Sequence, residues 1–71
     1  MAAEIGKALR RSRVESGLSQ EALADRAGIH RTYVGDVERG ERNVAIVNLV
    51  RLSAALRVPL SRIIVEMERG L

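Results

Sequence analysis

The sequence predicts an all-α fold, a compact bundle of about five helices. Apolar residues recur three and four positions apart along most of the chain, which is the spacing of one face of an α-helix. Residues that end or begin helices interrupt this pattern at Gly17, Gly28, Gly40 and Pro59, and they divide it into short segments. Seventy-one residues provide room for a single core, so we expect one domain over residues 1–71.

The composition favours a nucleic-acid partner over a membrane, a metal or a disulfide-bonded fold. Twelve basic residues stand against nine acidic ones, and all but Lys7 of the basic residues are arginine, whose planar fork suits phosphate and guanine edges. A solvated surface that merely favours arginine is the alternative. There is no cysteine, no His/Cys cluster with metal-ligand spacing, no apolar run long enough to span a membrane and no signal-peptide stretch. We therefore expect a cytoplasmic protein without a metal or a cofactor.

The first helix is expected over residues 3–16. One face of it is apolar or small, and Gly17 is a natural stop. The members of that face are Ile5, Ala8, Leu9 and Ser12. Its other faces carry mainly basic side chains, so this helix is strongly basic.

Residues 18–40 predict two short helices joined by a tight turn. Ser19 is placed to cap the first of them, and Gly28 stands where the chain must turn, in a conformation that glycine adopts without steric cost. The second helix begins near His30 and carries polar residues at its N-terminal end. This is the arrangement by which a helix-turn-helix presents side chains to the DNA major groove.

A fourth helix is expected over residues 45–57, after a loop at 41–45. One apolar stripe is expected to face the preceding helices: Ile46, Leu49, Leu52 and Leu56. A second stripe lies on roughly the opposite side: Val47, Val50 and Ala54. A helix that is apolar on two sides must be covered twice, so the second stripe needs the fifth helix or another subunit.

The fifth helix is expected to begin after Pro59, which suits a first helical turn. We expect residues 45–69 to supply a two-fold dimer interface: Val47, Val50, Ala54, Ile63, Ile64, Val65 and Met67. Such a homodimer would place two recognition helices about 34 Å apart, the spacing of an inverted repeat read on one side of DNA.

Four residues carry a resemblance to a known family. Ala24, Gly28, Val34 and Val37 match the small, glycine and apolar positions of the helix-turn-helix in the lambda repressor and Cro family, the XRE-type regulators. The resemblance extends from about residue 5 to residue 67. The runs RTYV and ERGERN, which begin at residues 31 and 38, are similar to those of the controller proteins of restriction–modification systems.

The resemblance implies a lambda-repressor-like domain that acts as a homodimeric transcription regulator on an inverted-repeat operator in double-stranded DNA. The role implied is that of a restriction–modification controller, with RNA polymerase as a further partner; a phage-type repressor and an antitoxin that represses its own operon are alternatives. A protein-interaction module that does not bind DNA is an alternative from another class. No serine has a paired base and no glycine-rich phosphate loop is present, so we do not expect an enzyme.

Arg31 and Thr32, at the start of the recognition helix, are expected to contact bases. Arginine bonds guanine O6 and N7 together, and a threonine methyl contacts the methyl of thymine. Tyr33 either contributes to base recognition or packs beside the helix.

The N–H groups at the start of the helix near Gln20 form a phosphate site. By resemblance, Gln20 bonds the same phosphate, and Arg42 and Asn43 lie against the DNA backbone, with Arg11 extending this clamp. Solvated positions for Gln20 and Arg42 are the alternatives.

By resemblance, Arg13 pairs with Glu38 and ties the first helix to the recognition helix; two independent surface charges are the alternative. The roles of His30, Gly35 and Asp36 stay open. His30 is an ordinary surface or cap-position residue or a pH switch, and Asp36 either accepts from cytosine N4 or pairs with Arg39. Arg57 stands where related sequences usually have glycine, which predicts a left-handed conformation.

Overall fold

The computed structural model describes all residues from 1 to 71 and contains five helices and no strand. The helices are α1 (Ala2–Glu15), α2 (Gln20–Ala27), α3 (Arg31–Glu38), α4 (Ile46–Leu56) and α5 (Leu60–Arg69). The predicted all-α fold is confirmed, and the expected helix ends agree to within a few residues. None of the five helices is both long and apolar enough to cross a bilayer.

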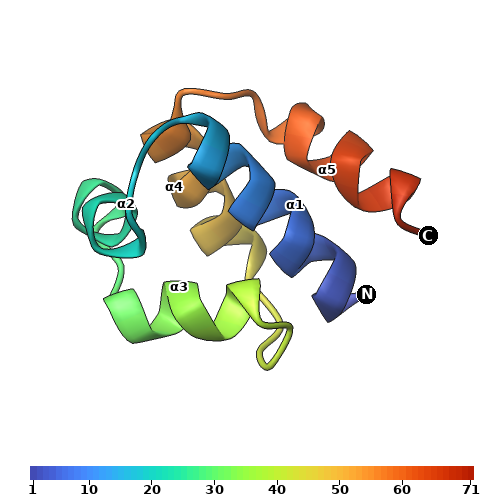
Figure 1. The fold of residues 1–71 in the computed structure, drawn as a ribbon, viewed down its shortest axis with the longest axis horizontal. Helices are drawn as coiled ribbons and strands as arrows, with labels where there is room; N and C mark the ends of the chain where they lie inside the picture. The colour runs from blue at the N-terminus through green and yellow to red at the C-terminus, as the bar shows by residue number, and fades with distance from the viewer.

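The helix α1 lies at the centre of the molecule and packs against α3 on one side and α5 on the other (Figure 1). The helix α2 packs against α3 and α4, and α5 also contacts α4. The core between them consists of ten buried apolar residues: Ala8, Leu9, Leu23, Ala24, Val34, Val37, Leu49, Leu52, Leu56 and Ile63. Every helix contributes to this one core, so the rest of the bundle determines where α3 lies.

The backbones of α1 and α3 meet at Gly6. A Cβ atom at this position would lie 2.8 Å from the carbonyl oxygen of Glu38 and nearer still to that of Val37. Backbone atoms at the end of a packed helix have little room to shift, so only glycine fits at this contact. The helical pattern of the sequence does not reveal this contact, because a glycine inside a helix usually signals only a weaker helix.

We expect Gly6→Ala to lower the free energy of unfolding by about 1–3 kcal/mol, since the added methyl group overpacks the contact between α1 and α3. Urea denaturation followed by circular dichroism measures this change. The matched control is Gly35→Ala in α3, where a Cβ would meet only the side-chain ends of Arg39 and Gln20. The control should be neutral or slightly stabilising; equal losses for the two variants would contradict the tight backbone contact.

The outer face of α4 remains uncovered in the single chain. Ile46 is 65% exposed, so the expectation that it joins the inward stripe is wrong; it lies on the first turn, beyond the edge of the core. Val47 and Val50 are 60% and 47% exposed, and α5 does not cover them. The expected second stripe is therefore an exposed apolar surface.

The structure corrects the prediction that Ile63 lies at a dimer interface. Its side chain is fully buried and belongs to the core, because α5 turns this residue inward against the bundle. Ile64 and Met67 are partly buried and pack against the same core, whereas Val65 remains exposed. Of the expected interface residues on α5, Val65 is the one that points clearly outward.

The predicted left-handed conformation of Arg57 is confirmed. Arg57 ends α4 with a φ of 58°, and it is the one residue other than glycine with a positive φ. Its N–H bonds the carbonyl oxygen of Ala54, so the turn forms in spite of the steric cost of an arginine Cβ.

Arg57→Gly should raise the free energy of unfolding by about 1 kcal/mol, because glycine adopts this conformation without strain. In thermal denaturation of a chain of this size, that change raises Tm by about 4–8 °C. Arg57→Ala serves as the control, since it removes the same charge and keeps the strained Cβ. An equal rise in both variants would assign the effect to charge rather than to the backbone.

Candidate nucleic-acid interface

Residues 18–40 form the predicted helix-turn-helix. Ser19 Oγ accepts a hydrogen bond of 3.0 Å from the N–H of Ala22, which caps α2 as expected. Gly28 ends α2 in the left-handed conformation, with φ 68° and ψ 35°, and the chain then turns into α3. The left-handed conformation at Gly28 permits the tight turn between α2 and α3.

His30 caps the start of α3. Its Nδ1 accepts a hydrogen bond of 3.2 Å from the N–H of Thr32. Of the interpretations left open by the sequence, the structure supports the cap-position histidine.

A buried carboxylate joins the first three helices. Arg13 donates from Nε to Glu38 Oε2 at 2.6 Å and from Nη2 to Glu38 Oε1 at 3.0 Å, which makes a bidentate ion pair. The Glu38 side chain is 3% exposed, and the hydrogen bond to it raises the pKa of Arg13. The third guanidinium nitrogen of Arg13 donates to the carbonyl oxygen of Leu18, just before α2. The predicted pair between Arg13 and Glu38 is therefore present.

Gln20 is a third member of this cluster. Its Nε2 donates to Glu38 Oε1 at 3.0 Å, so this residue is not merely solvated. An amide nitrogen has two N–H groups, and the contact with Glu38 uses only one of them. The sequence pointed to a role for Gln20 at a phosphate but gave no sign of this bond, since residues 18 positions apart share no local pattern.

A polar hollow of about 220 Å³ opens between α2 and α3, and no apolar side chain lines it. Its lining consists of Gln20, Arg31, Thr32, Gly35 and Arg39. Gly35 leaves this space open, because a Cβ there would lie 3.1 Å from Nη1 of Arg39 and 3.5 Å from Oε1 of Gln20. Arg31 and Thr32 are both exposed at its edge, as expected for residues that contact another molecule.

Tyr33 anchors the loop that follows α3. Its hydroxyl accepts a hydrogen bond of 3.2 Å from the N–H of Ala45, and its ring is half-buried. The guanidinium of Arg42 lies over this ring, 5.4 Å from its centroid. Of the two roles considered for Tyr33, packing beside the helix is the one that the structure shows; Asn43 is exposed in the same loop.

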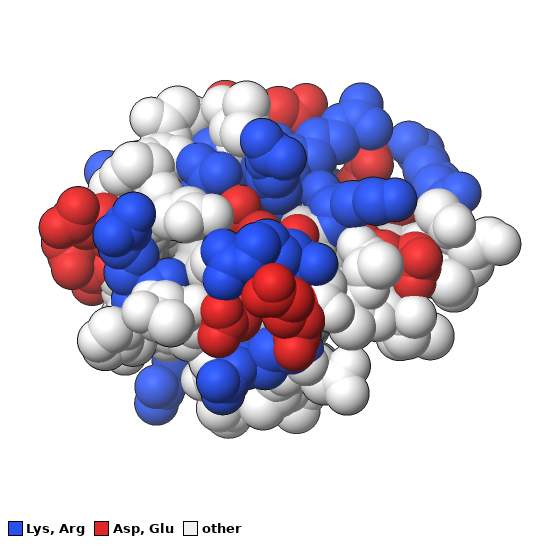
Figure 2. Space-filling model, turned by 60° about the horizontal axis from the view of Figure 1, so that its bottom comes forward, with Lys and Arg blue, Asp and Glu red and all other residues white.

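Asp36 pairs with two arginines. Its Oδ1 is 2.6 Å from Nη2 of Arg39, and its Oδ2 is 3.6 Å from Nη2 of Arg42. Arg39 also donates from Nε to Glu41 at 3.1 Å, and the bond to Glu41, together with the charge of Asp36, raises the pKa of Arg39. The expected pair between Asp36 and Arg39 is present, and near the centre of Figure 2 acidic side chains lie between basic ones.

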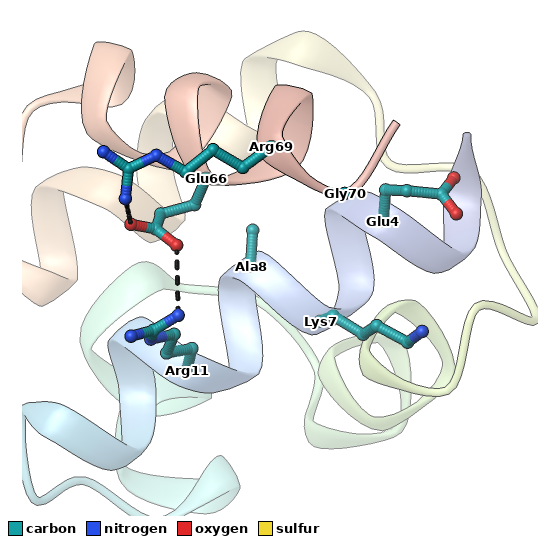
Figure 3. Close-up of a pocket in the computed structure, with 7 residues that line it drawn as sticks. All are labelled: Glu4, Lys7, Ala8, Arg11, Glu66, Arg69 and Gly70. Atoms are coloured by element: carbon teal, nitrogen blue, oxygen red, sulfur yellow. Dashed lines mark hydrogen bonds and ion pairs between the residues drawn. The ribbon is translucent and has the colours of Figure 1, made fainter.

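Arg11 lies away from these residues. It is two positions from Arg13, about 200° around α1, so it projects toward α5 rather than α3. There it approaches Glu66 at 3.4 Å, and Glu66 also contacts Arg69 (Figure 3). Arg11 thus lies beside the groove between α1 and α5 and is mostly exposed, and the expectation that it extends the phosphate clamp stays a prediction.

The ion pair between Arg13 and Glu38 can be tested through the stability of variants. Arg13→Ala should lower the free energy of unfolding by about 3 kcal/mol, because it leaves a buried carboxylate without a counter-charge. Denaturant titration of the two single variants and of Arg13→Ala/Glu38→Ala measures the coupling. The double variant should be more stable than the sum of the single losses implies; simple additivity would show that the two charges act independently.

Comparison with known proteins agrees with this geometry. A family model described as helix-turn-helix matches residues 9–63. The chain is 47% identical over 49 residues to the control protein C.SmaI of Serratia marcescens, an alignment that covers 69% of this chain and 58% of that protein. It is 40% identical over 65 residues to the control protein C.MunI of Mycoplasma sp, with 90% and 88% of the two chains covered.

A solved structure is similar over most of its length. The restriction–modification controller protein C.AhdI from Aeromonas hydrophila superposes with a TM-score of 0.85 at 45% identity, and the match covers 87% of this chain and 94% of that one.

The chain therefore belongs to the helix-turn-helix family, a class of DNA-binding transcription regulators. Within that class it is similar to the controller proteins of restriction–modification systems, as the motif resemblance indicated.

Proposed function

We propose that this protein regulates transcription as a homodimer on a specific double-stranded DNA operator, in the role of a restriction–modification controller. The observation that carries the proposal is the support of α3. Its C-terminal end is held by the buried pair of Arg13 and Glu38, while Arg31 and Thr32 at its N-terminal end are exposed. A helix that is fixed against the bundle and exposes polar side chains at its N-terminal end is suited to enter a major groove.

Base recognition falls to the exposed residues at the start of α3. Arg31 bonds O6 and N7 of a guanine, and Thr32 contacts a thymine methyl or a phosphate. Tyr33 supports the loop and has only a secondary part in recognition, because its hydroxyl already accepts from Ala45. Sequence discrimination therefore depends mainly on two side chains per subunit.

Phosphate contacts position this helix. The free N–H groups at the start of α2 and the second N–H of Gln20 bind one phosphate, with the helix dipole behind them. Arg42 and Asn43 contact the backbone from the loop after α3. These contacts carry no sequence information, and they make binding weaken as salt rises.

The homodimer uses the exposed apolar face of α4. Val47, Val50 and Ala54 form its centre, with Val65 and the exposed edges of Ile64 and Met67 from α5 as the further members proposed. Covering this face removes apolar valine surface from water, which stabilises the dimer by about 25 cal/mol for each Å² of apolar area buried. Activation by such a dimer would also involve RNA polymerase as a partner.

Arg31→Ala should weaken binding to the operator by about 10- to 100-fold, since one bidentate base contact is worth about 1–3 kcal/mol. A gel shift with DNA from upstream of the protein's own gene, with unrelated DNA as competitor, measures this change. Arg62→Ala is the control, because Arg62 is an exposed arginine on α5, outside the helix-turn-helix. Equal binding by Arg31→Ala and wild type would contradict the proposal that α3 recognises the operator.

Val50→Glu should convert the dimer to a monomer, because it buries a charge without a partner in the proposed apolar interface. Sedimentation velocity of wild type and variant at the same concentration measures this change. Val14→Glu is the control, an exposed valine on α1 of similar exposure. A monomeric wild type at high concentration, or a dimer that persists in Val50→Glu, would contradict this interface.

A further inference from the structure

Asp36 is placed between two arginines at the proposed DNA surface. One carboxylate oxygen lies 2.6 Å from Arg39 and the other lies 3.6 Å from Arg42. The aspartate side chain is only 21% exposed, whereas each arginine is 55% exposed. The carboxylate is therefore shielded by the two guanidinium groups, which remain accessible to an incoming ligand.

The two arginines are held on different parts of the same surface. Arg39 borders the polar hollow that Arg31 and Thr32 also line, and its Nε is bound by Glu41. Arg42 is held over the ring of Tyr33 in the loop after α3. Asp36 thus restrains Arg42 and, together with Glu41, Arg39.

An acidic residue at a DNA surface needs a physical reason, since it repels phosphates. Exposed arginines bind DNA of any sequence, because the attraction comes from the charge of the backbone. Arginine side chains that move freely find a phosphate in almost any docking position. Arginines held by a carboxylate reach a phosphate only where the protein has settled in one register, and each loses less side-chain freedom on binding there.

We propose that Asp36 is a specificity-determining residue that acts through Arg39 and Arg42. By confining both side chains it weakens binding to unrelated DNA more than binding to the operator. This inference rests on the proposed function, and it adds a role for a residue that itself need not touch a base.

The test compares Asp36→Asn with Asp25→Asn. Asp25 is an exposed carboxylate on α2 for which the structure shows no ion pair, so its replacement changes the net charge equally without releasing an arginine. The Kd of each protein is measured by fluorescence anisotropy for two duplexes of equal length. One is the upstream sequence bound in the gel shift, and the other is a scrambled version, each studied over a range of salt concentrations.

Asp36→Asn should tighten binding to the scrambled duplex by about tenfold and change operator binding by less than about threefold, so that discrimination falls. The dependence of log Kd on log salt for the scrambled duplex should steepen by about one to two, one for each arginine that gains a phosphate. Asp25→Asn should leave discrimination within about twofold of wild type. Adding Arg39→Gln and Arg42→Gln to Asp36→Asn should abolish the gain on scrambled DNA.

Two results would overturn the role of Asp36. The first is an equal change in discrimination for Asp36→Asn and Asp25→Asn, which would be a plain charge effect. The second is weaker binding of Asp36→Asn to both duplexes, which would show that Asp36 supports the fold. If the asparagine variant does not fold, the test is repeated with Asp36→Ser, after its melting curve has been shown to match that of the wild type. A wild-type protein that does not distinguish the two duplexes would instead contradict the proposed function.

Discussion

The ion pair of Glu38 with Arg13 is the interaction on which the arrangement of α3 depends. A carboxylate that is 3% exposed loses most of its hydration, which costs several kcal/mol unless its oxygens are fully bonded. Here three donors from α1 and α2 satisfy it. Such a pair adds little net stability compared with an apolar contact of the same volume, but it tolerates only one geometry. Its main effect is to specify where the end of α3 lies.

The packing around this pair has the same effect. At Gly6, about two turns before Arg13 on α1, a Cβ would clash with the carbonyl groups of Val37 and Glu38, so α1 and the end of α3 approach closely with no side chain between them. The N-terminal half of α3 is held on its inner face by the buried Val34, and its first turn is capped by His30. The helix is therefore rigid where it joins the bundle and accessible where it carries Arg31 and Thr32. A surface that is ordered before binding loses less conformational entropy when a ligand arrives.

Local patterns in the sequence were sufficient for the helices and for the caps at Ser19 and Gly28, because each depends on residues within one or two turns. Resemblance to related sequences supplied the strained Arg57 and the pair of Arg13 and Glu38, which periodicity alone does not reveal. The bond from Gln20 to Glu38 and the approach at Gly6 depend on how helices far apart in sequence are oriented, and no local pattern encodes that orientation. The errors at Ile46 and Ile63 have the same origin. Periodicity tells which residues share a face, but the packing of α4 and α5 decides which edge of that face is covered.

The uncovered stripe on α4 and the restrained charges near α3 together bear on how a domain this small recognises DNA. A single α3 offers two exposed side chains for base contacts, and at about 1–3 kcal/mol each they cannot separate one site from a genome of competitors. Releasing the arginines held by Asp36 would strengthen binding, but mainly through phosphates, which every sequence provides. Pairing two chains through Val47 and Val50 doubles the number of base contacts and adds the spacing between half-sites as a further criterion. In the proposed dimer, the two symmetric sets of base contacts thus supply the affinity for the operator. The carboxylate of Asp36 limits the part of the binding energy that does not depend on sequence.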